Sequence, residues 1–478
     1  MQYQSTTNPA LRASSAQAVL QGLAADGGLY VTDRLEGFDL SAALKEEDTL
    51  AIARRVLSFL LPDFPDMEAL VRRAYTGKFE TPELTPLRQV GDRFVLELFR
   101  GPTAAFKDVA LSLLPQLITA ARRLCGIDDE ILILTATSGD TGKAALRGFA
   151  GVEGTKILVF YPADGVSAVQ KAQMVTQEGG NVGVCAVRGN FDDTQSGVKA
   201  IFSAGVPEGC GVRLSSANSI NIGRLAPQVV YYIKAYADLL RRGVVRYGEP
   251  VDFVVPTGNF GDILAGYLAK RMGLPVGKLV CASNRNDVLT EFFRTGVYRA
   301  RRPFYRTLSP SMDILISSNL ERLLWLLAPQ EVAGYMQSLR TQGGYRVSEA
   351  LLARLQAEFS CGCCDDAQTQ RVIGEVWRTH RYLLDTHTAV AWSAAPSERP
   401  TVVLSTASPY KFPAAVLGAL GGEGSADEFE TMRRLERETG VPIPAGLRDL
   451  EKKPVLHRDV IERDRMHAYV RSRIENWR

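Results

Sequence analysis

Residues 101–108 read Gly-Pro-Thr-Ala-Ala-Phe-Lys-Asp, and they stand between two segments of different periodicity. Upstream, residues 93–99 alternate in hydrophobicity and are rich in β-forming side chains, which predicts a strand. Downstream, residues 109–124 carry apolar side chains at helical spacing, with Pro115 as the one interruption, which predicts a helix. Lys107 is therefore expected at a strand-to-helix turn, in or just before the first helical turn.

A lysine at this place can be considered as a reactive amine. To act as an amine near neutral pH, its pKa must fall from about 10.4 by roughly three units, or about 4 kcal/mol. The positive end of a helix dipole disfavours an ammonium there by at most about 2 kcal/mol. The remainder requires burial or a covalent imine. Taken alone, Lys107 is equally consistent with a surface lysine in a turn.

The chain from about residue 89 predicts an α/β fold with parallel strands. Continuous runs of Val, Ile and Leu alternate with helical segments, and such runs indicate parallel strands that are covered on both faces. Ligands bind at the carboxyl ends of the strands in sheets of this kind. The runs are 130–135, 156–161, 181–187, 252–256, 278–282 and 401–405.

The same patterns divide the chain into three parts. Residues 1–88 are expected to form a small mixed N-terminal segment, with helices over 14–24, 50–61 and 67–74. Residues 89–420 are the expected catalytic core, and residues 421–478 are a charged segment that we expect to be helical.

Composition excludes several classes of protein. The 478 residues are 46% hydrophobic and 23% charged, with a net charge of +3, as in an ordinary globular protein. This balance argues against a nucleic-acid partner. No run reaches the roughly 18 apolar residues of a membrane span, and the first residues lack a signal core, so a cytoplasmic protein is expected. The seven cysteines are read as reduced thiols; Cys361, Cys363 and Cys364 lack a second pair, and no metal is expected.

Two loops after strands are suited to anions. The loop 135–143 ends in Gly-Lys, but Thr137 and Ala144 stand where a nucleotide P-loop requires Gly and Ser or Thr. Its hydroxyls and its helix start suit a carboxylate instead. In the loop 256–262, Gly258 and Gly261 allow a tight backbone, and the absence of Lys and Arg suits a phosphate held by amides. Each loop alone is also consistent with a plain glycine turn.

Seven stretches together resemble the threonine synthase family, which belongs to the fold-type II enzymes that depend on pyridoxal phosphate (PLP). The first and the fourth stretch distinguish this family from dehydratases and cysteine synthases. The resemblance implies a tryptophan synthase β-like architecture of two interleaved halves, each with a parallel sheet. The stretches are 21–30, 101–108, 137–142, 216–224, 258–262, 385–390 and 405–412.

The resemblance also implies roles for individual residues. Lys107 would bind PLP covalently, and Thr406, or failing it Ser405, would hydrogen-bond the ring nitrogen. The cofactor phosphate would lie on Gly258, Asn259, Phe260 and Gly261, and Asp262 would also bind the cofactor. The substrate carboxylate would lie on Ser138, Gly139, Asp140 and Thr141. The substrate phosphate would lie on Asn218, Ser219, Asn221 and Arg224, and a forked, permanently charged guanidinium suits a phosphate.

Some residues need separate comment. Ser408 and Tyr410 stand where much of the family has His and a small residue, and we expect this departure to be structural. A carboxylate cannot face a substrate carboxylate, so Asp140 is expected to accept hydrogen bonds from loop amides and to orient them. His387 is the only histidine within a matching stretch, and we interpret it as structural.

The implied reaction converts O-phospho-L-homoserine and water into L-threonine and phosphate, in a monomer or a homodimer. A related PLP phospho-lyase, which releases phosphate and a 2-oxoacid, is an alternative. A serine/threonine dehydratase is another, and it would not need Arg224. A non-catalytic interaction protein is a third alternative, against which an intact Lys107 argues.

Overall fold

A computed structural model describes residues 2–137, 139–164, 166–207, 209–396 and 398–477. Its first sheet has six strands in the order β14-β11-β10-β15-β5-β4, all parallel except β4, which pairs antiparallel with β5. Every residue of β10 and β15 is buried, as expected for strands covered on both faces. The strands are β4 (Leu87–Val90), β5 (Arg93–Glu97), β10 (Val251–Pro256), β11 (Val276–Ser283), β14 (Phe359–Cys363) and β15 (Thr401–Ser405).

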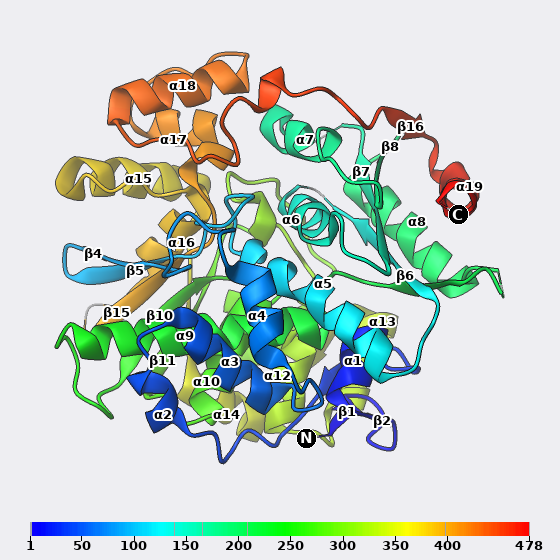
Figure 1. Ribbon diagram of the computed structural model, residues 1–478. Helices are drawn as coiled ribbons and strands as arrows, with labels where there is room; N and C mark the ends of the chain where they lie inside the picture. The colour runs from blue at the N-terminus through cyan, green and yellow to red at the C-terminus, as the bar shows by residue number, and fades with distance from the viewer. Residues whose placement is uncertain (1, 138, 165, 208, 397, 478) are drawn as a thin grey trace.

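The second sheet has five parallel strands in the order β16-β8-β7-β6-β9. Four of them come from the chain between β5 and β10, so the second sheet is inserted into the first in sequence (Figure 1). The predicted α/β class with two interleaved halves is confirmed. The strands are β6 (Glu130–Ala136), β7 (Thr155–Pro162), β8 (Val182–Val187), β9 (Val212–Ser215) and β16 (Asp459–Ile461).

The N-terminal segment forms a small antiparallel sheet and four helices that pack beside α5 and α9 (Figure 1). Ser14 caps α1 through a capping box with Gln17, and Gly22, at φ 75°, ends it, so the helix is shorter than predicted. The elements are β1 (Tyr3–Ser5), β2 (Arg12–Ala13), β3 (Tyr30–Val31), α1 (Ser15–Gln21), α2 (Leu40–Lys45), α3 (Thr49–Leu60) and α4 (Met67–Tyr75).

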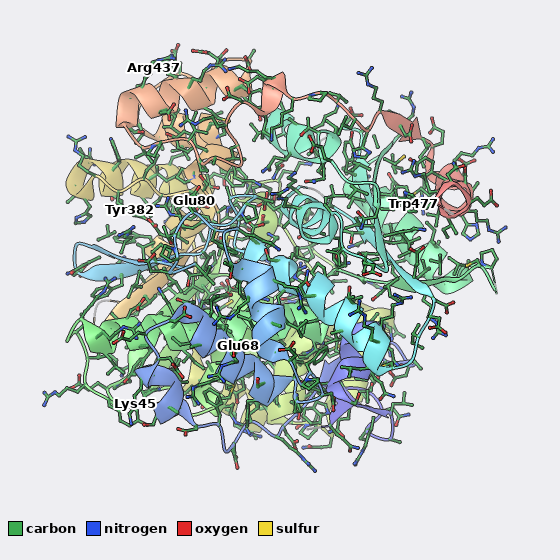
Figure 2. The ribbon with its side chains drawn as sticks, in the orientation of Figure 1. Lys45, Glu68, Glu80, Tyr382, Arg437 and Trp477 are labelled. Atoms are coloured by element: carbon green, nitrogen blue, oxygen red, sulfur yellow. The ribbon has the colours of Figure 1, made fainter. Side chains whose placement is uncertain are left out.

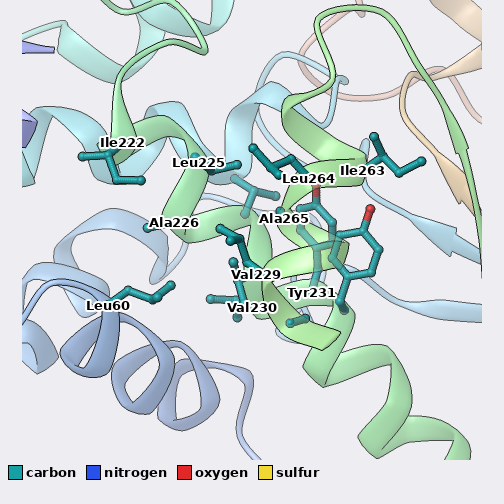
Figure 3. Packing of buried hydrophobic residues seen from close by; sticks show 14 of the residues in the cluster. Leu60, Ile222, Leu225, Ala226, Val229, Val230, Tyr231, Ile263, Leu264 and Ala265 are labelled. Carbon is teal, nitrogen blue, oxygen red and sulfur yellow. The ribbon is translucent and has the colours of Figure 1, made fainter. Parts of the chain in front are cut away.

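Helices cover the two larger sheets. Helices α9 and α10, which matter most to the site, lie side by side in the core. Leu225 of α9 and Leu264 of α10 point toward one another there, in the same apolar cluster as Leu60 of α3 (Figure 3). These helices are α5 (Lys107–Leu124), α6 (Asp140–Phe149), α7 (Ala168–Val175), α8 (Phe191–Ala204), α9 (Ile222–Arg241), α10 (Gly261–Arg271), α11 (Val288–Thr295) and α12 (Leu320–Leu327). Further along the chain are α13 (Val332–Gln342), α14 (Glu349–Glu358), α15 (Asp366–His380), α16 (Thr386–Ala394) and the hairpin β12 (Val297–Arg299) with β13 (Gly344–Arg346).

The last part of the chain is not helical throughout, and the prediction for 421–478 needs correction. Beside α18 (Glu428–Thr439) and α19 (Met466–Asn476), it contains β16, which adds an edge strand to the second sheet next to β8. Lys156 on β7 donates to the carbonyl of Trp477, which Figure 2 labels, at 3.0 Å. The end of the chain is therefore part of the core that precedes it, together with α17 (Pro413–Ala419). Of the helices described, none combines the length and apolarity that crossing a membrane requires.

Candidate active site

Lys107 is the first residue of α5, at the predicted strand-to-helix turn. Its loop pairs with residues 405–408, which follow β15. The N–H of Phe106 donates to the carbonyl of Thr406 at 2.8 Å, and the N–H of Ser408 donates to the carbonyl of Ala104 at 3.0 Å. These backbone bonds bring Lys107 and Thr406 to the same place, although most of the chain separates them in sequence.

The environment of Lys107 favours the neutral amine. Burial, together with the positive charges of Arg224 and Lys411, lowers its pKa to about 8, although Asp140 acts in the opposite direction. The amine lies 4.7 Å from the centre of the Phe106 ring. Burial, rather than the helix start alone, is thus the main cause of the shift that the sequence argument required.

Asp108 shapes the turn, a role that the sequence argument missed. Its carboxylate accepts from the N–H of Thr103 at 2.8 Å and from the Thr103 hydroxyl at 2.7 Å. Ala104 adopts a left-handed φ of 59°, which this local pairing holds. A Cβ at Gly101 would lie 2.4 Å from Asp108 Cβ, so only glycine fits there.

The loop between β10 and α10 presents backbone amides. Within the described residues, the N–H groups of Gly258, Asn259 and Phe260 make no hydrogen bond. The N–H groups at the start of α10 have no acceptor within their own helix. The left-handed residue is Phe260, at φ 64°, not either glycine. Gly258 is required for another reason: its Cβ would lie 2.7 Å from the carbonyl oxygen of Ser311.

The side chain of Asp262 points away from this loop, toward two tyrosines of α9. Its carboxylate accepts from Tyr231 at 2.5 Å and from Tyr232 at 2.9 Å, both on α9. Oδ2 is buried without a partner, and burial raises the pKa of Asp262 to about 6. Only the N–H of Asp262, in the first turn of α10, remains suited to an anion.

Thr406 and Ser405 differ in what their hydroxyls contact. Ser405 Oγ accepts from Thr388 at 3.0 Å, so it is engaged within the protein. The hydroxyl of Thr406 makes no hydrogen bond within the described part of the chain, although the residue is buried. Thr406 is therefore the better placed of the two to hydrogen-bond a ligand.

The loop before α6 is organised differently from the expectation. Thr137 Oγ1 accepts from the N–H groups of Gly139 and Gly142, each at 3.0 Å. Among the described residues of the loop, no amide donates to Asp140; its carboxylate forms an ion pair with Lys411 at 2.6 Å and accepts from Gln170 at 3.1 Å. Thr141 is half-buried in the first turn of α6. Ser138 lies outside the described residues.

Lys411 is a buried residue that sequence reasoning passed over. Besides Asp140, its amine donates to Gln173 Oε1 at 2.9 Å and to the carbonyl of Thr103 at 3.3 Å. Burial works against ionisation of Asp140, but the charges of Lys411 and Lys107 hold the pKa of that carboxyl well below its usual range. Lys411 thus joins the loop before α6 to the loop of Lys107.

The expected substrate-phosphate residues divide into two groups. Arg224 is 3% exposed; within the described residues its guanidinium makes one hydrogen bond, to the carbonyl of Ala217, and its buried Nε has no partner. Burial lowers its pKa to about 10. Asn218 and Ser219 are half-buried nearby, and Ser219 Cβ lies 3.6 Å from where a Cβ at Gly261 would stand.

Asn221, by contrast, has a structural role. Its Nδ2 donates to the carbonyl of Val19 at 2.9 Å, and its Oδ1 accepts from the N–H of Gly223 at 2.8 Å as the cap of α9. The expectation that this amide binds the substrate phosphate needs correction. The cap also explains why the helix starts at Ile222.

His387 is likewise held on both sides. Nδ1 lies 3.0 Å from Asp385 Oδ1, and Nε2 accepts from the N–H of Ser311 at 3.1 Å. An acceptor at Nε2 requires the neutral ring with its proton on Nδ1. Because Ser311 approaches Gly258, His387 supports the amide loop, in agreement with its structural interpretation.

The departures at Ser408 and Tyr410 also have local explanations. Ser408 Oγ accepts from the N–H of Tyr410 at 3.3 Å, and Tyr410 donates to the carbonyl of Val441 near the end of α18.

Cys361 and Cys363 lie on β14 and Cys364 follows it. The described residues contain no group of three His, Cys, Asp or Glu side chains arranged to hold a metal ion.

Three family models match the chain. The model for pyridoxal-phosphate-dependent enzymes matches residues 78–405. The model for the threonine synthase N terminus matches residues 2–75, and the model for the threonine synthase C-terminal region matches residues 387–470. Together they cover nearly all of the sequence.

Individual proteins are also similar. Threonine synthase of Pseudomonas aeruginosa is 40% identical over 92% of this chain and 94% of its own length. Threonine synthase-like 1 of Homo sapiens is 38% identical over 85% of this chain, which spans only 58% of the length of that protein. The crystal structure of PLP-bound threonine synthase from Brucella melitensis has a TM-score of 0.89 at 38% identity, covering 100% of this chain and 99% of that one.

Proposed function

Because the chain belongs to the threonine synthase family of pyridoxal-phosphate-dependent enzymes, we propose that it converts O-phospho-L-homoserine and water into L-threonine and phosphate. The observation that carries this proposal is Arg224, a buried guanidinium whose Nε has no partner and which forms no ion pair with a described carboxylate. A buried charge of this kind is favourable only with a counter-charge, and a substrate phosphate provides one.

The residues present fit the cofactor. Lys107 offers an amine of lowered pKa, the amides of the loop 258–260 and of the start of α10 suit a phosphate, and Thr406 offers a free hydroxyl. When bound, PLP draws electrons away from the α-carbon of an amino acid. A hydroxyl at the ring nitrogen accepts or donates a hydrogen bond without adding a formal charge.

Each of these residues has a distinct task in the proposed reaction. Lys107 Nζ binds the cofactor and then, as a neutral amine, accepts the proton of the α-carbon. Arg224 orients the substrate phosphate and stabilises its charge as the bond to the γ-carbon breaks. Lys411 and Asp140 hold the loop before α6 against the Lys107 loop, which fixes the place of the substrate carboxylate between them.

The related phospho-lyase reaction is a second candidate, because it uses the same substrate contacts up to the loss of phosphate. The two candidates differ only after phosphate leaves: addition of water at the β-carbon gives threonine, whereas release of the intermediate gives a 2-oxoacid and ammonia.

The experiment is an incubation of the PLP-loaded protein with O-phospho-L-homoserine, with phosphate, L-threonine and 2-oxoacid measured in the same sample. Threonine equal to phosphate supports the proposal, and 2-oxoacid equal to phosphate supports the phospho-lyase. Turnover of serine or threonine, with no turnover of O-phospho-L-homoserine, would refute both.

A further inference from the structure

Arg322 on α12 is buried and connects three separate segments. It is 1% exposed, and each of its three nitrogens donates to a different acceptor. Nε donates to the carbonyl of Tyr30 at 2.8 Å, Nη1 to Asn319 Oδ1 at 2.5 Å, and Nη2 to the carbonyl of Ile220 at 2.5 Å. The planar fork of a guanidinium is the side chain that can donate in three directions at once and stay charged.

One of these acceptors, Ile220, lies in the loop proposed to bind the substrate phosphate, and another, Asn319, contacts the loop proposed to bind the cofactor phosphate. The N–H and the Nδ2 of Asn319 both donate to the carbonyl of Asn259, at 3.0 and 3.1 Å, within the amide loop. Ile220 lies between Ser219 and the start of α9, which carries Arg224. The position of Arg322 therefore constrains both loops together.

The third acceptor belongs to the N-terminal segment. Tyr30 is on β3, and its carbonyl accepts the hydrogen bond from Arg322 Nε. The same segment also contacts the 215–221 loop directly, through the Asn221 bond to Val19 and a bond of 3.1 Å from Ser215 Oγ to the carbonyl of Leu20. The apolar contacts of α9 with α10 and with α3 form the adjacent core (Figure 3).

We propose that Arg322 is a positioning residue through which the N-terminal segment holds the cofactor-phosphate loop and the substrate-phosphate loop in register. This inference rests on the proposed function for the identity of the two anions. It assigns the N-terminal segment a task in ligand binding, although none of the site residues lies in that segment. Loss of the guanidinium leaves Ile220 in the substrate-phosphate loop, and Asn319 beside the cofactor-phosphate loop, without their donor, so both loops move together.

The test compares Arg322→Lys and Arg322→Gln with a matched control, Lys234→Met. Lys234 is also buried, also extends from the core to a carbonyl of the N-terminal segment, Thr85 at 2.7 Å, and lies on α9 ten residues beyond Arg224. Retention of PLP by the holoenzyme in equilibrium dialysis and binding of inorganic phosphate by calorimetry are measured for each variant. KM and kcat for O-phospho-L-homoserine are measured as well.

Both Arg322 variants are expected to weaken retention of PLP and binding of phosphate by about tenfold or more, and to raise KM more than they lower kcat. Lys234→Met is expected to change both affinities less than about twofold. A lower melting temperature with both affinities unchanged would overturn the proposal, and so would a loss of only one affinity. The two binding measurements stand even if O-phospho-L-homoserine is not the substrate, so failure of the proposed function is distinguishable.

If neither Arg322 variant folds, Asn319→Ala breaks the same connection on the cofactor side only. It is expected to weaken retention of PLP while phosphate binding stays within about twofold of the parent protein. Unchanged retention of PLP in this variant would overturn the proposal.

Discussion

The change in the free energy of unfolding on replacing Arg224 by Met has opposite signs for an arginine that binds a ligand and for an arginine that only stabilises the fold. Burial lowers the pKa of Arg224 from 12.5 to about 10, and this shift corresponds to roughly 3 kcal/mol by which the fold disfavours the charge. The variant loses one hydrogen bond to the carbonyl of Ala217, worth about 1.5–3 kcal/mol because its donor is charged. The ligand-free variant is therefore expected to be as stable as the parent protein, or up to about 1.5 kcal/mol more stable.

A structural arginine in a buried ion pair would give the opposite result, because its removal leaves an uncompensated carboxylate and costs about 3–5 kcal/mol. The stability measurement is urea unfolding of the PLP-loaded protein with and without inorganic phosphate. Phosphate at about 100 times its dissociation constant should stabilise the parent protein by about 2.7 kcal/mol, and the Arg224→Met variant much less. Arg242→Met is the control, because Arg242 follows the same helix and donates to the carbonyl of Leu87 at 2.7 Å.

The kinetic consequence follows from the same contact. Loss of a buried, charge-assisted bond to a phosphate costs about 2–5 kcal/mol, so kcat/KM for O-phospho-L-homoserine should fall roughly thirty-fold to several thousand-fold. Retention of PLP should not change, because its phosphate is expected on the amides after β10. A loss of about 3 kcal/mol in stability with kcat/KM unchanged would refute the reasoning and favour the dehydratase alternative.

Three further predictions concern the rest of the site. Lys107→Ala should fold normally but lose turnover and the visible absorbance of bound PLP. In the parent protein stripped of PLP, the rate at which PLP binds again should increase with pH and level off above about pH 8, where the amine is neutral. A rate that continues to increase toward pH 10.5 would contradict a lowered pKa. Gly258→Val should lower retention of PLP in dialysis, because its Cβ would lie 2.7 Å from the Ser311 carbonyl; equal retention would place the phosphate elsewhere. Lys411→Met should lose about 3–5 kcal/mol in urea unfolding, and adding Asp140→Asn should recover most of it; additive losses would show that the pair is not coupled.

Local signals in the sequence were sufficient for β5, for α5 and for the position of Lys107 between them. Periodicity predicted β5 and α5 and therefore the turn that carries Lys107, because hydrophobic spacing depends only on neighbouring residues. The glycines of the loop 256–262 predicted an anion-binding turn by the same kind of evidence. Even here the reason differed in detail: Gly258 is required by the approach of Ser311, which is distant in sequence, and Phe260 carries the left-handed backbone.

The tertiary structure alone decided which polar side chains face a ligand and which face the protein. Asp140 forms an ion pair with Lys411, Asp262 accepts hydrogen bonds from two tyrosines of α9, and Asn221 donates to the carbonyl of Val19. None of these partners could be predicted from the spacing of residues along the chain. A buried polar group must find a partner wherever the fold brings one, so its contacts depend on elements that are far apart in sequence. Arg322 is the clearest example. Its three acceptors come from the N-terminal sheet, from the loop before α9 and from the start of its own helix, and only the packing of these segments brings them to one guanidinium.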